Sequence, residues 1–126
     1  MAPADVAIWN RFMAANPTAF EAVAYDVAVG EGAEFDTNTR PDGGGDVNRL
    51  YQRKIDVVAQ AGDVLYIIEI KPRATTAAIG QVKGYMRLFA RDYNPKQAMQ
   101  PLIITDSLMP EMQYLCDVEN VKIFVV

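Results

Sequence analysis

The sequence predicts an α/β or α+β domain built on a mixed sheet. Three observations indicate it: apolar residues alternate along some segments, they recur every three to four residues along others, and the two kinds follow the order α-β-β-β-α-β, then α-β. A tight turn between early strands favours antiparallel pairing, and helical connections between later strands favour parallel pairing. The length of 126 residues, with 51% hydrophobic residues, fits a single domain, residues 1–126.

The boundaries of the predicted elements come from proline, glycine and asparagine. The elements are a helix over 5–15, strands over 22–29, 50–59 and 64–71, a helix from Thr75 or Thr76 to Asp92, a strand over 102–105, a helix over 110–116 and a strand over 121–126. Pro72 ends one strand because it cannot donate to a sheet ladder. In the first strand, Val23, Tyr25, Val27 and Val29 are expected on one side. An acidic, glycine-rich stretch over 30–46 is expected to be a long loop.

The composition excludes several kinds of site. The sequence has no histidine, which excludes a Ser-His-Asp triad, a histidine general base and most zinc catalysis. The single cysteine, Cys116, excludes an intrachain disulfide, and we expect a buried, inert thiol there. Without histidine and with one cysteine, we expect any chemistry to use carboxylates, lysines and hydroxyls. We see no signal-peptide pattern and no membrane span, so we expect a cytoplasmic protein.

The charge is distributed unevenly along the chain. The net charge is −4, but residues 1–48 carry −6, residues 49–96 carry +5 and residues 97–126 carry −3. A basic middle between acidic flanks is typical of a phosphate-binding face on an acidic body. The alternative is a set of solvated helix and strand edges, which is the more common origin of such a pattern.

Two carboxylates and a lysine lie in or next to apolar strands of the central hairpin. Glu69 and Lys71 are two residues apart, so strand alternation places them on one face, and Asp56 of the partner strand can lie beside them. A divalent cation would relieve the repulsion between the two carboxylates, and Mg²⁺ suits oxygen ligands. Lys71 could then orient or deprotonate an attacking water. The competing interpretation is a buried ion-pair cluster that stabilises the hairpin.

These residues resemble the PD-(D/E)xK nuclease superfamily, whose pattern is an aspartate on one strand and Glu/Asp-x-Lys at the end of the next. Here the pattern corresponds to Asp56 and Glu69-Ile70-Lys71, and the resemblance covers about residues 4–105. The next helix carries Gln81 and Tyr85 one turn apart, similar to the Gln-x-x-x-Tyr signature of the RecB-like branch. The resemblance implies a restriction-endonuclease-like αβββαβ core with an added C-terminal α-β.

The resemblance also implies roles for individual residues. The implied metal ligands, for Mg²⁺ or Mn²⁺, are Asp56, Glu69 and the carbonyl of Ile70, with Lys71 as the catalytic lysine and Gln81 as a supporting catalytic residue. Two departures from the family pattern stand out. Ile55 replaces the proline that names the motif, and the acidic residue of the first helix has no clear counterpart among Asp5, Glu21 and Asp26.

Seven residues around the motif are candidate DNA contacts. They are Arg53, Lys54, Arg73, Lys83, Tyr85, Arg87 and Arg91. Three of them, Lys83, Arg87 and Arg91, are spaced by four and form a stripe along one helix. The same stripe can equally be the solvated face of an amphipathic helix.

Two functions from different classes follow. The first is a small Mg²⁺-dependent DNA nuclease, directed by DNA structure or ends rather than by sequence, and acting as a homodimer. The second is a nuclease-like fold used without catalysis as a structural or adaptor protein of an assembly such as a phage particle. An accessory DNA-binding subunit is a third possibility. If the chain is phage-encoded, we expect it in the host cytoplasm, or in the virion under the second function.

Overall fold

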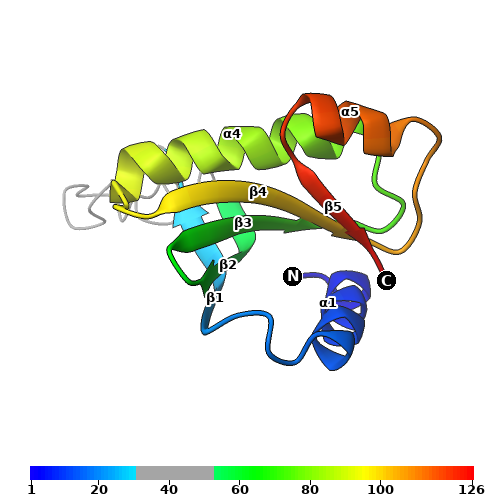
Figure 1. Ribbon diagram of the computed structural model, residues 1–126, viewed down its shortest axis with the longest axis horizontal. Coiled ribbons are helices and arrows are strands. Elements are labelled where there is room, and N and C mark those ends of the chain that lie inside the picture. The colour runs from blue at the N-terminus through cyan, green and yellow to red at the C-terminus, as the bar shows by residue number, and fades with distance from the viewer. Residues whose placement is uncertain (31–52) are drawn as a thin grey trace, which may run out of the picture.

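A mixed sheet of five strands lies between helices in the part of the chain that the structure describes, residues 1–30 and 53–126 (Figure 1). In this computed structural model the elements are α1 (Pro3–Ala15), β1 (Ala22–Val29), β2 (Arg53–Ala61), β3 (Val64–Ile70), α4 (Thr76–Tyr93), β4 (Ala98–Thr105), α5 (Met112–Val118) and β5 (Lys122–Val125). The strands lie in the order β1-β2-β3-β4-β5. The first three pair antiparallel and the last three parallel, which confirms the predicted mixed sheet.

Each face of the sheet carries its own hydrophobic core, because side chains alternate along the strands. Val58, Ile67 and Ile103 pack with α4 and α5 on one face. Ile68 and Ile104 pack with α1 on the other. Figure 1 shows α4 and α5 on one side of the sheet and α1 on the opposite side. A strand that is apolar on both faces, such as β3, is typical of the centre of a sheet covered by helices.

Strand β4 is longer than predicted, since it begins at Ala98 rather than at residue 102. The reason is the position of Pro101, which pairs with Ile67 of β3 inside the strand. Thr105 accepts a hydrogen bond from Val126 at 2.9 Å, so by alternation the backbone of Pro101 faces the β5 side. Pairing with β5 starts only at Leu102, and the missing N–H of Pro101 therefore costs no ladder bond.

The other boundaries differ by a few residues. Helix α1 begins at Pro3, a residue suited to the first helical position, and α5 runs two residues later than predicted. Thr75 occupies the N-cap of α4, but its side chain makes no capping hydrogen bond. The predicted strand 50–59 is β2, of which residues 50–52 lie outside the described residues, as does nearly all of the predicted loop 30–46. None of the helices in residues 1–30 and 53–126 has the length and apolar character needed to cross a membrane.

The predicted alternation of β1 is wrong, because the strand changes face at Asp26. This residue has a left-handed φ of 50°, which a non-glycine residue rarely adopts inside a strand. Val23 packs in the core on the α1 side, whereas Val27 and Val29 pack on the α4 side. Tyr25 is exposed, and its hydroxyl accepts a hydrogen bond from Trp9 of α1 at 3.1 Å. The change of face at Asp26 therefore lies next to the residue of β1 that contacts α1.

Candidate metal centre

The regular pairing of β2 with β3 stops one step before the two motif carboxylates. The last pair is Val57↔Ile68, so a continued antiparallel ladder would bring the N–H of Ile70 to residue 55. Instead, the N–H of Ile70 donates to Oδ2 of Asp56 at 2.9 Å. A side-chain carboxylate thus takes the place of a backbone acceptor at the open end of this hairpin.

The carbonyl of Ile70 lies on the same side as that N–H. The N–H of Lys71 donates to Ile104 of β4 at 3.0 Å, so alternation turns the backbone groups of Ile70 towards β2. No side chain in residues 1–30 and 53–126 donates to this carbonyl, and the β2–β3 ladder ends before it. Asp56 and the Ile70 carbonyl therefore offer oxygen atoms at one place.

The strand register, continued past the recorded pairs, places three acidic residues in a row on adjacent strands. Continuing the β2–β3 register by one step puts Asp56 across from Glu69. In the neighbouring ladder, Tyr25↔Val57 and Val27↔Ile55 leave Asp26 across from Asp56, the one step without a recorded pair. This register agrees with Asp56 and Glu69 lying beside each other on adjacent strands, and their role at a site stays a prediction.

Glu69 is the buried member of this row, with a relative exposure of only 6%. It has no hydrogen bond or ion pair within the described residues. Burial, with the neighbouring Asp56 charge second, raises the pKa of Glu69 from 4.5 to about 8, although the Lys71 ammonium acts in the opposite direction. A buried carboxyl group without a partner is costly, and a cation would remove that cost.

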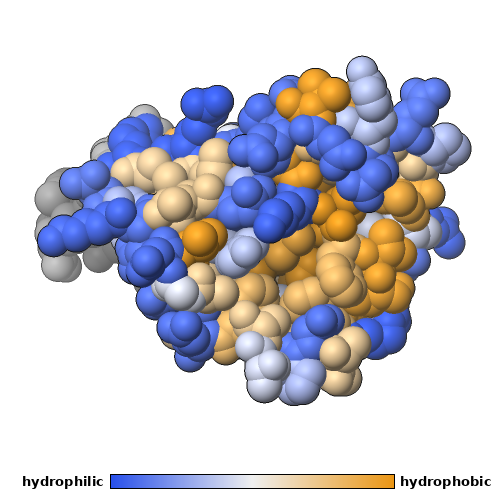
Figure 2. Space-filling view, in the orientation of Figure 1, coloured by the Kyte–Doolittle hydropathy of each residue, from blue (hydrophilic) through white to orange (hydrophobic). Residues whose placement is uncertain are grey.

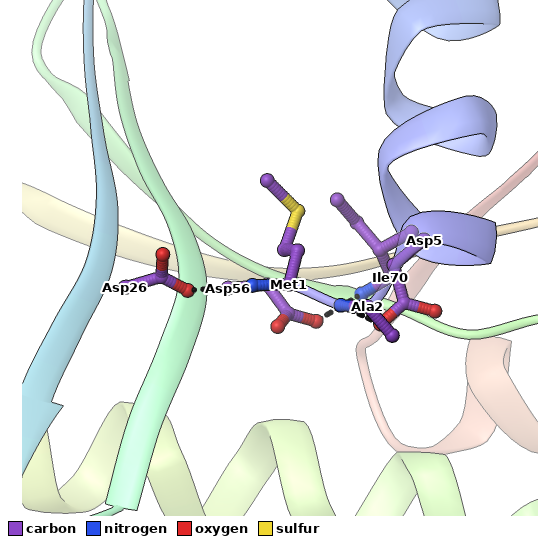
Figure 3. A network of polar contacts seen from close by, with 6 residues as sticks. All are labelled: Met1, Ala2, Asp5, Asp26, Asp56 and Ile70. Carbon is purple, nitrogen blue, oxygen red and sulfur yellow. Dashed lines mark hydrogen bonds and ion pairs between the residues drawn. The ribbon is translucent and has the colours of Figure 1, made fainter.

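Asp56 is influenced by the charges of the first helix and the first strand. Burial raises its pKa, the hydrogen bond from Ile70 opposes the rise, and the Asp5 carboxylate adds to it. Asp26 also raises the pKa, whereas the amino group of Met1, which donates to Asp26 Oδ1 at 3.1 Å, lowers it. Figure 3 shows these polar groups together, with Asp5 accepting the N–H of Ala2 at 3.3 Å.

Asp5 and Asp26 are therefore the two acidic residues whose place at the site the sequence did not reveal. The Asp5 charge acts on both Asp56 and Glu69, so the start of α1 lies close to the motif carboxylates. Asp5 is thus an acidic residue of the first helix that lies near Asp56 and Glu69. For Asp26, the sequence showed only an acidic residue within an alternating apolar strand. The structure shows that the strand changes face at this residue.

The basic candidates divide into two groups. Arg53 and Lys54 open β2 just before Asp56, and Lys71 and Arg73 follow β3; all four are exposed. By contrast, two members of the predicted helical stripe are engaged elsewhere. Lys83 forms an ion pair with Glu119 at 3.3 Å, and Arg91 pairs with Asp92 at 2.8 Å. Arg87 is exposed and has no ion pair in the described part of the chain. These pairs favour the solvated-face interpretation for Lys83 and Arg91.

The remaining sequence candidates lie on helices of the α4 side. Gln81 and Tyr85 share one face of α4, as their spacing predicts, since the Gln81 amide donates to the Tyr85 hydroxyl at 3.0 Å. Cys116 is fully buried in α5, which confirms the prediction of a buried thiol, and burial raises its pKa. It lies in the hydrophobic core rather than at the carboxylates.

The donor set fits a magnesium ion better than a metal held by protein ligands alone. In residues 1–30 and 53–126, no three acidic or cysteine side chains are close enough to hold a metal by themselves. Two carboxylates and a backbone carbonyl remain, from Asp56, Glu69 and Ile70. Mg²⁺ is commonly held by one or two carboxylates together with waters and substrate phosphates.

The chain shares its fold with solved structures that include a repair endonuclease. EndoMS in complex with dsDNA is 17% identical, with a TM-score of 0.54 over 95% of this chain and 43% of that one. A repair endonuclease from Pyrococcus abyssi is 16% identical, with a TM-score of 0.56 over 95% and 46%. A protein of unknown function is 15% identical, with a TM-score of 0.59 over 94% and 55%.

These likenesses define a class of fold. The chain spans about half the length of the solved proteins it matches, so it corresponds to one part of each. No protein-family model matches the sequence, and no curated protein matches it either. The chain is thus a mixed α/β domain with a nuclease-like fold, and its own activity has to be argued from the carboxylates.

Proposed function

We propose that this protein is a Mg²⁺-dependent DNA nuclease of the PD-(D/E)xK type that hydrolyses phosphodiester bonds. The observation that carries the proposal is the buried Glu69 carboxyl, which has no partner among the described residues and which the continued strand register puts across from Asp56. A structural ion-pair cluster would have supplied a cation to that carboxyl. The exposed Lys71 does not form such a pair with it.

In this proposal, Asp56, Glu69 and the Ile70 carbonyl would hold the ion, with Mn²⁺ able to replace Mg²⁺. The bound ion would supply an activated water and offset the charge that develops on the phosphate. Asp56 keeps its carboxylate fixed through the hydrogen bond from Ile70 at 2.9 Å. Lys71 is exposed beside Glu69, where its ammonium can orient the attacking water and interact with the phosphate.

The proposed substrate is DNA, bound through its backbone. Arg53, Lys54 and Arg73 are exposed on both sides of the carboxylates and can contact phosphates without reading bases. EndoMS, which shares the fold, has been solved with double-stranded DNA, and this supports the choice of substrate. With so few candidate contacts, we propose that DNA structure or ends, rather than a long sequence, direct cleavage. On α4, Gln81 would be a supporting catalytic residue and Tyr85 a DNA contact.

The experiment is cleavage of supercoiled, linear, single-stranded and branched DNA with Mg²⁺ or Mn²⁺. We expect metal-dependent cutting that is lost in Asp56→Asn, Glu69→Gln and Lys71→Met. Asp63→Asn and Lys96→Met, which change exposed residues away from the carboxylates, are the matched controls and should cut normally. Cutting that persists in all three site variants would show that the activity does not come from these residues.

A second candidate is a non-catalytic adaptor with the same fold, and exposed apolar residues favour it. Figure 2 shows hydrophobic residues gathered on the side of β5, α5 and α1. Tyr114 and Val118 of α5 are 68% and 62% exposed, and Phe124 of β5 is 41% exposed. Such a patch is typical of a protein interface. An absence of cutting on every substrate, with normal folding of wild type and variants, would favour this function. Light scattering would test the proposed homodimer under either one.

A further inference from the structure

The segment that joins β3 to α4 donates three backbone hydrogen bonds to residues at and just after the end of β4. The N–H of Lys71 donates to the Ile104 carbonyl at 3.0 Å. The N–H of Arg73 donates to Oδ1 of Asp106 at 2.8 Å. The N–H of Ala74 donates to Oγ1 of the buried Thr105 at 3.1 Å. Pro72, which lies between Lys71 and Arg73, has no N–H to donate.

Arg73 stands out in this segment because its backbone has a left-handed φ of 48°. Arginine disfavours this region, since its Cβ approaches the neighbouring carbonyl oxygen. Such a conformation persists only where the surroundings impose it, and residues of this kind are enriched at functional sites. The side chain of Arg73 is exposed and has no hydrogen bond or ion pair within the described residues.

We propose that Asp106 is a positioning residue, which holds Arg73 in this conformation so that its guanidinium meets a DNA phosphate beside the candidate metal centre. The contact that carries the inference is the short bond from the Arg73 N–H to the Asp106 carboxylate. Arg73 lies two residues after Lys71, in the same segment between β3 and α4, so the hydrogen bonds of this segment also fix the direction of the Arg73 side chain. The inference deepens the proposed nuclease function and rests on it.

The sign of the effect separates this role from simple electrostatics. Asp106 is an exposed acid close to a surface proposed to bind DNA. Removing a negative charge there should strengthen DNA binding if charge alone mattered. A positioning role predicts the opposite for Asp106→Ala, which removes the acceptor. Asp106→Asn keeps an acceptor oxygen while removing the charge, so it should bind DNA at least as well as wild type.

The test is the affinity of the protein for a short fluorescent DNA duplex, measured by anisotropy at several salt concentrations with Ca²⁺ in place of Mg²⁺. We expect Arg73→Ala to weaken binding about tenfold and to reduce the salt slope by about one. Asp106→Ala should match it, and the double variant should be no weaker than Arg73→Ala. The matched control is Asp63→Ala, which removes an exposed acid from the β2–β3 turn and should not weaken binding.

Each outcome decides the inference. Asp106→Ala binding as tightly as wild type, or additive losses in the double variant, would overturn it, and so would an Arg73→Ala variant with normal affinity. Cleavage of DNA by wild type in the parallel assay shows that the nuclease function stands in those cases. If wild type neither cuts nor binds DNA, both proposals fall together. Should Asp106→Ala not fold, Asp106→Glu, which displaces the carboxylate by one methylene, replaces it in the same comparison.

Discussion

The two ends of the β2–β3 hairpin use the same pair of strands in opposite ways. At the turn end, the pairs from Gln60↔Leu65 to Ala61↔Val64 are regular, and the N–H of Gly62 donates to Glu21 at 3.0 Å. At the open end, the ladder stops and the Asp56 carboxylate accepts a backbone hydrogen bond, while the buried Glu69 carboxyl has no partner in residues 1–30 and 53–126. The turn end has a regular ladder, whereas at the open end a side-chain carboxylate replaces a backbone acceptor.

The difference teaches where a functional site can be built in a small sheet. A regular ladder uses up every backbone donor and acceptor between two strands. Chemistry at a strand end becomes possible when a side chain replaces one ladder partner and frees a neighbouring carbonyl. On the other side of β3, Ile104 and Thr105 of β4 accept hydrogen bonds from Lys71 and Ala74, and Asp106, just after β4, accepts one from Arg73.

The largest expected effects come from substitutions at the open end of the hairpin, where metal binding and DNA cleavage can be measured separately. Glu69→Gln removes a proposed ligand and should abolish both Mn²⁺ binding and DNA cutting. Lys71→Met should lower cleavage by about 10²–10⁴-fold while leaving Mn²⁺ affinity intact, because a lysine acts on the water and phosphate rather than on the ion. Calorimetric titration with Mn²⁺ and single-turnover cleavage measure the two quantities. Loss of Mn²⁺ binding in Lys71→Met would show that Lys71 holds the site together instead.

The second prediction concerns pH. In the metal-free protein the pKa of Glu69 is about 8, against 4.5 ordinarily, so the folded state holds an extra proton between these values. The free energy of unfolding should therefore fall as the pH rises from 4.5 to 8. The expected fall is roughly 2–5 kcal/mol, at the upper end if the carboxyl stays fully desolvated. Urea unfolding in the presence of a chelator measures it.

The matched variant for this prediction is Glu69→Gln, which cannot titrate and should show a flatter dependence on pH. Saturating Mg²⁺ should flatten the wild-type dependence too, because a cation replaces the proton on the carboxyl. Parallel pH profiles for wild type and Glu69→Gln, both without metal, would contradict the assigned environment of Glu69.

The two ends of the hairpin were also unequally predictable from sequence. The turn at Gly62 and Asp63, the apolar strands and their order follow from alternation and turn residues, and the structure confirms them. Asp56, Glu69 and Lys71 were identified as candidates because charged residues interrupt or follow apolar strands. Asp5 and Asp26 were not placed, because their proximity depends on the packing of α1 and on a backbone irregularity at Asp26. Neither the packing of α1 nor this irregularity produces a periodic pattern in the sequence.

The third prediction tests the replaced ladder bond itself. Asp56→Ala removes the acceptor of the Ile70 N–H and should lower the free energy of unfolding by about 1–3 kcal/mol, because a buried donor loses its partner. Asp56→Asn keeps an acceptor oxygen and removes repulsion with Glu69, so it should be at least as stable as wild type. Both should be inactive in cleavage. Equal stability of Asp56→Ala and Asp56→Asn would mean that the hydrogen bond does not support the strand end.

The smallest expected effect compares two left-handed residues, one at each end of the β1–β2–β3 region. Gly62 has φ 59° in the turn, with nothing within 4 Å of the position a Cβ would take. Gly62→Ala should therefore cost only about 1 kcal/mol, from the left-handed backbone alone. Asp26 has φ 50° beside the carboxylates, so Asp26→Gly should relieve a similar strain. It should also remove a charge that raises the pKa of Asp56, while losing the contact with the Met1 amino group. Thermal unfolding of both variants, with cleavage rates alongside, measures the contrast. If Asp26→Gly gains stability but cuts DNA more slowly, Asp26 serves the site; if cutting is unchanged, the irregularity of β1 is only a feature of packing.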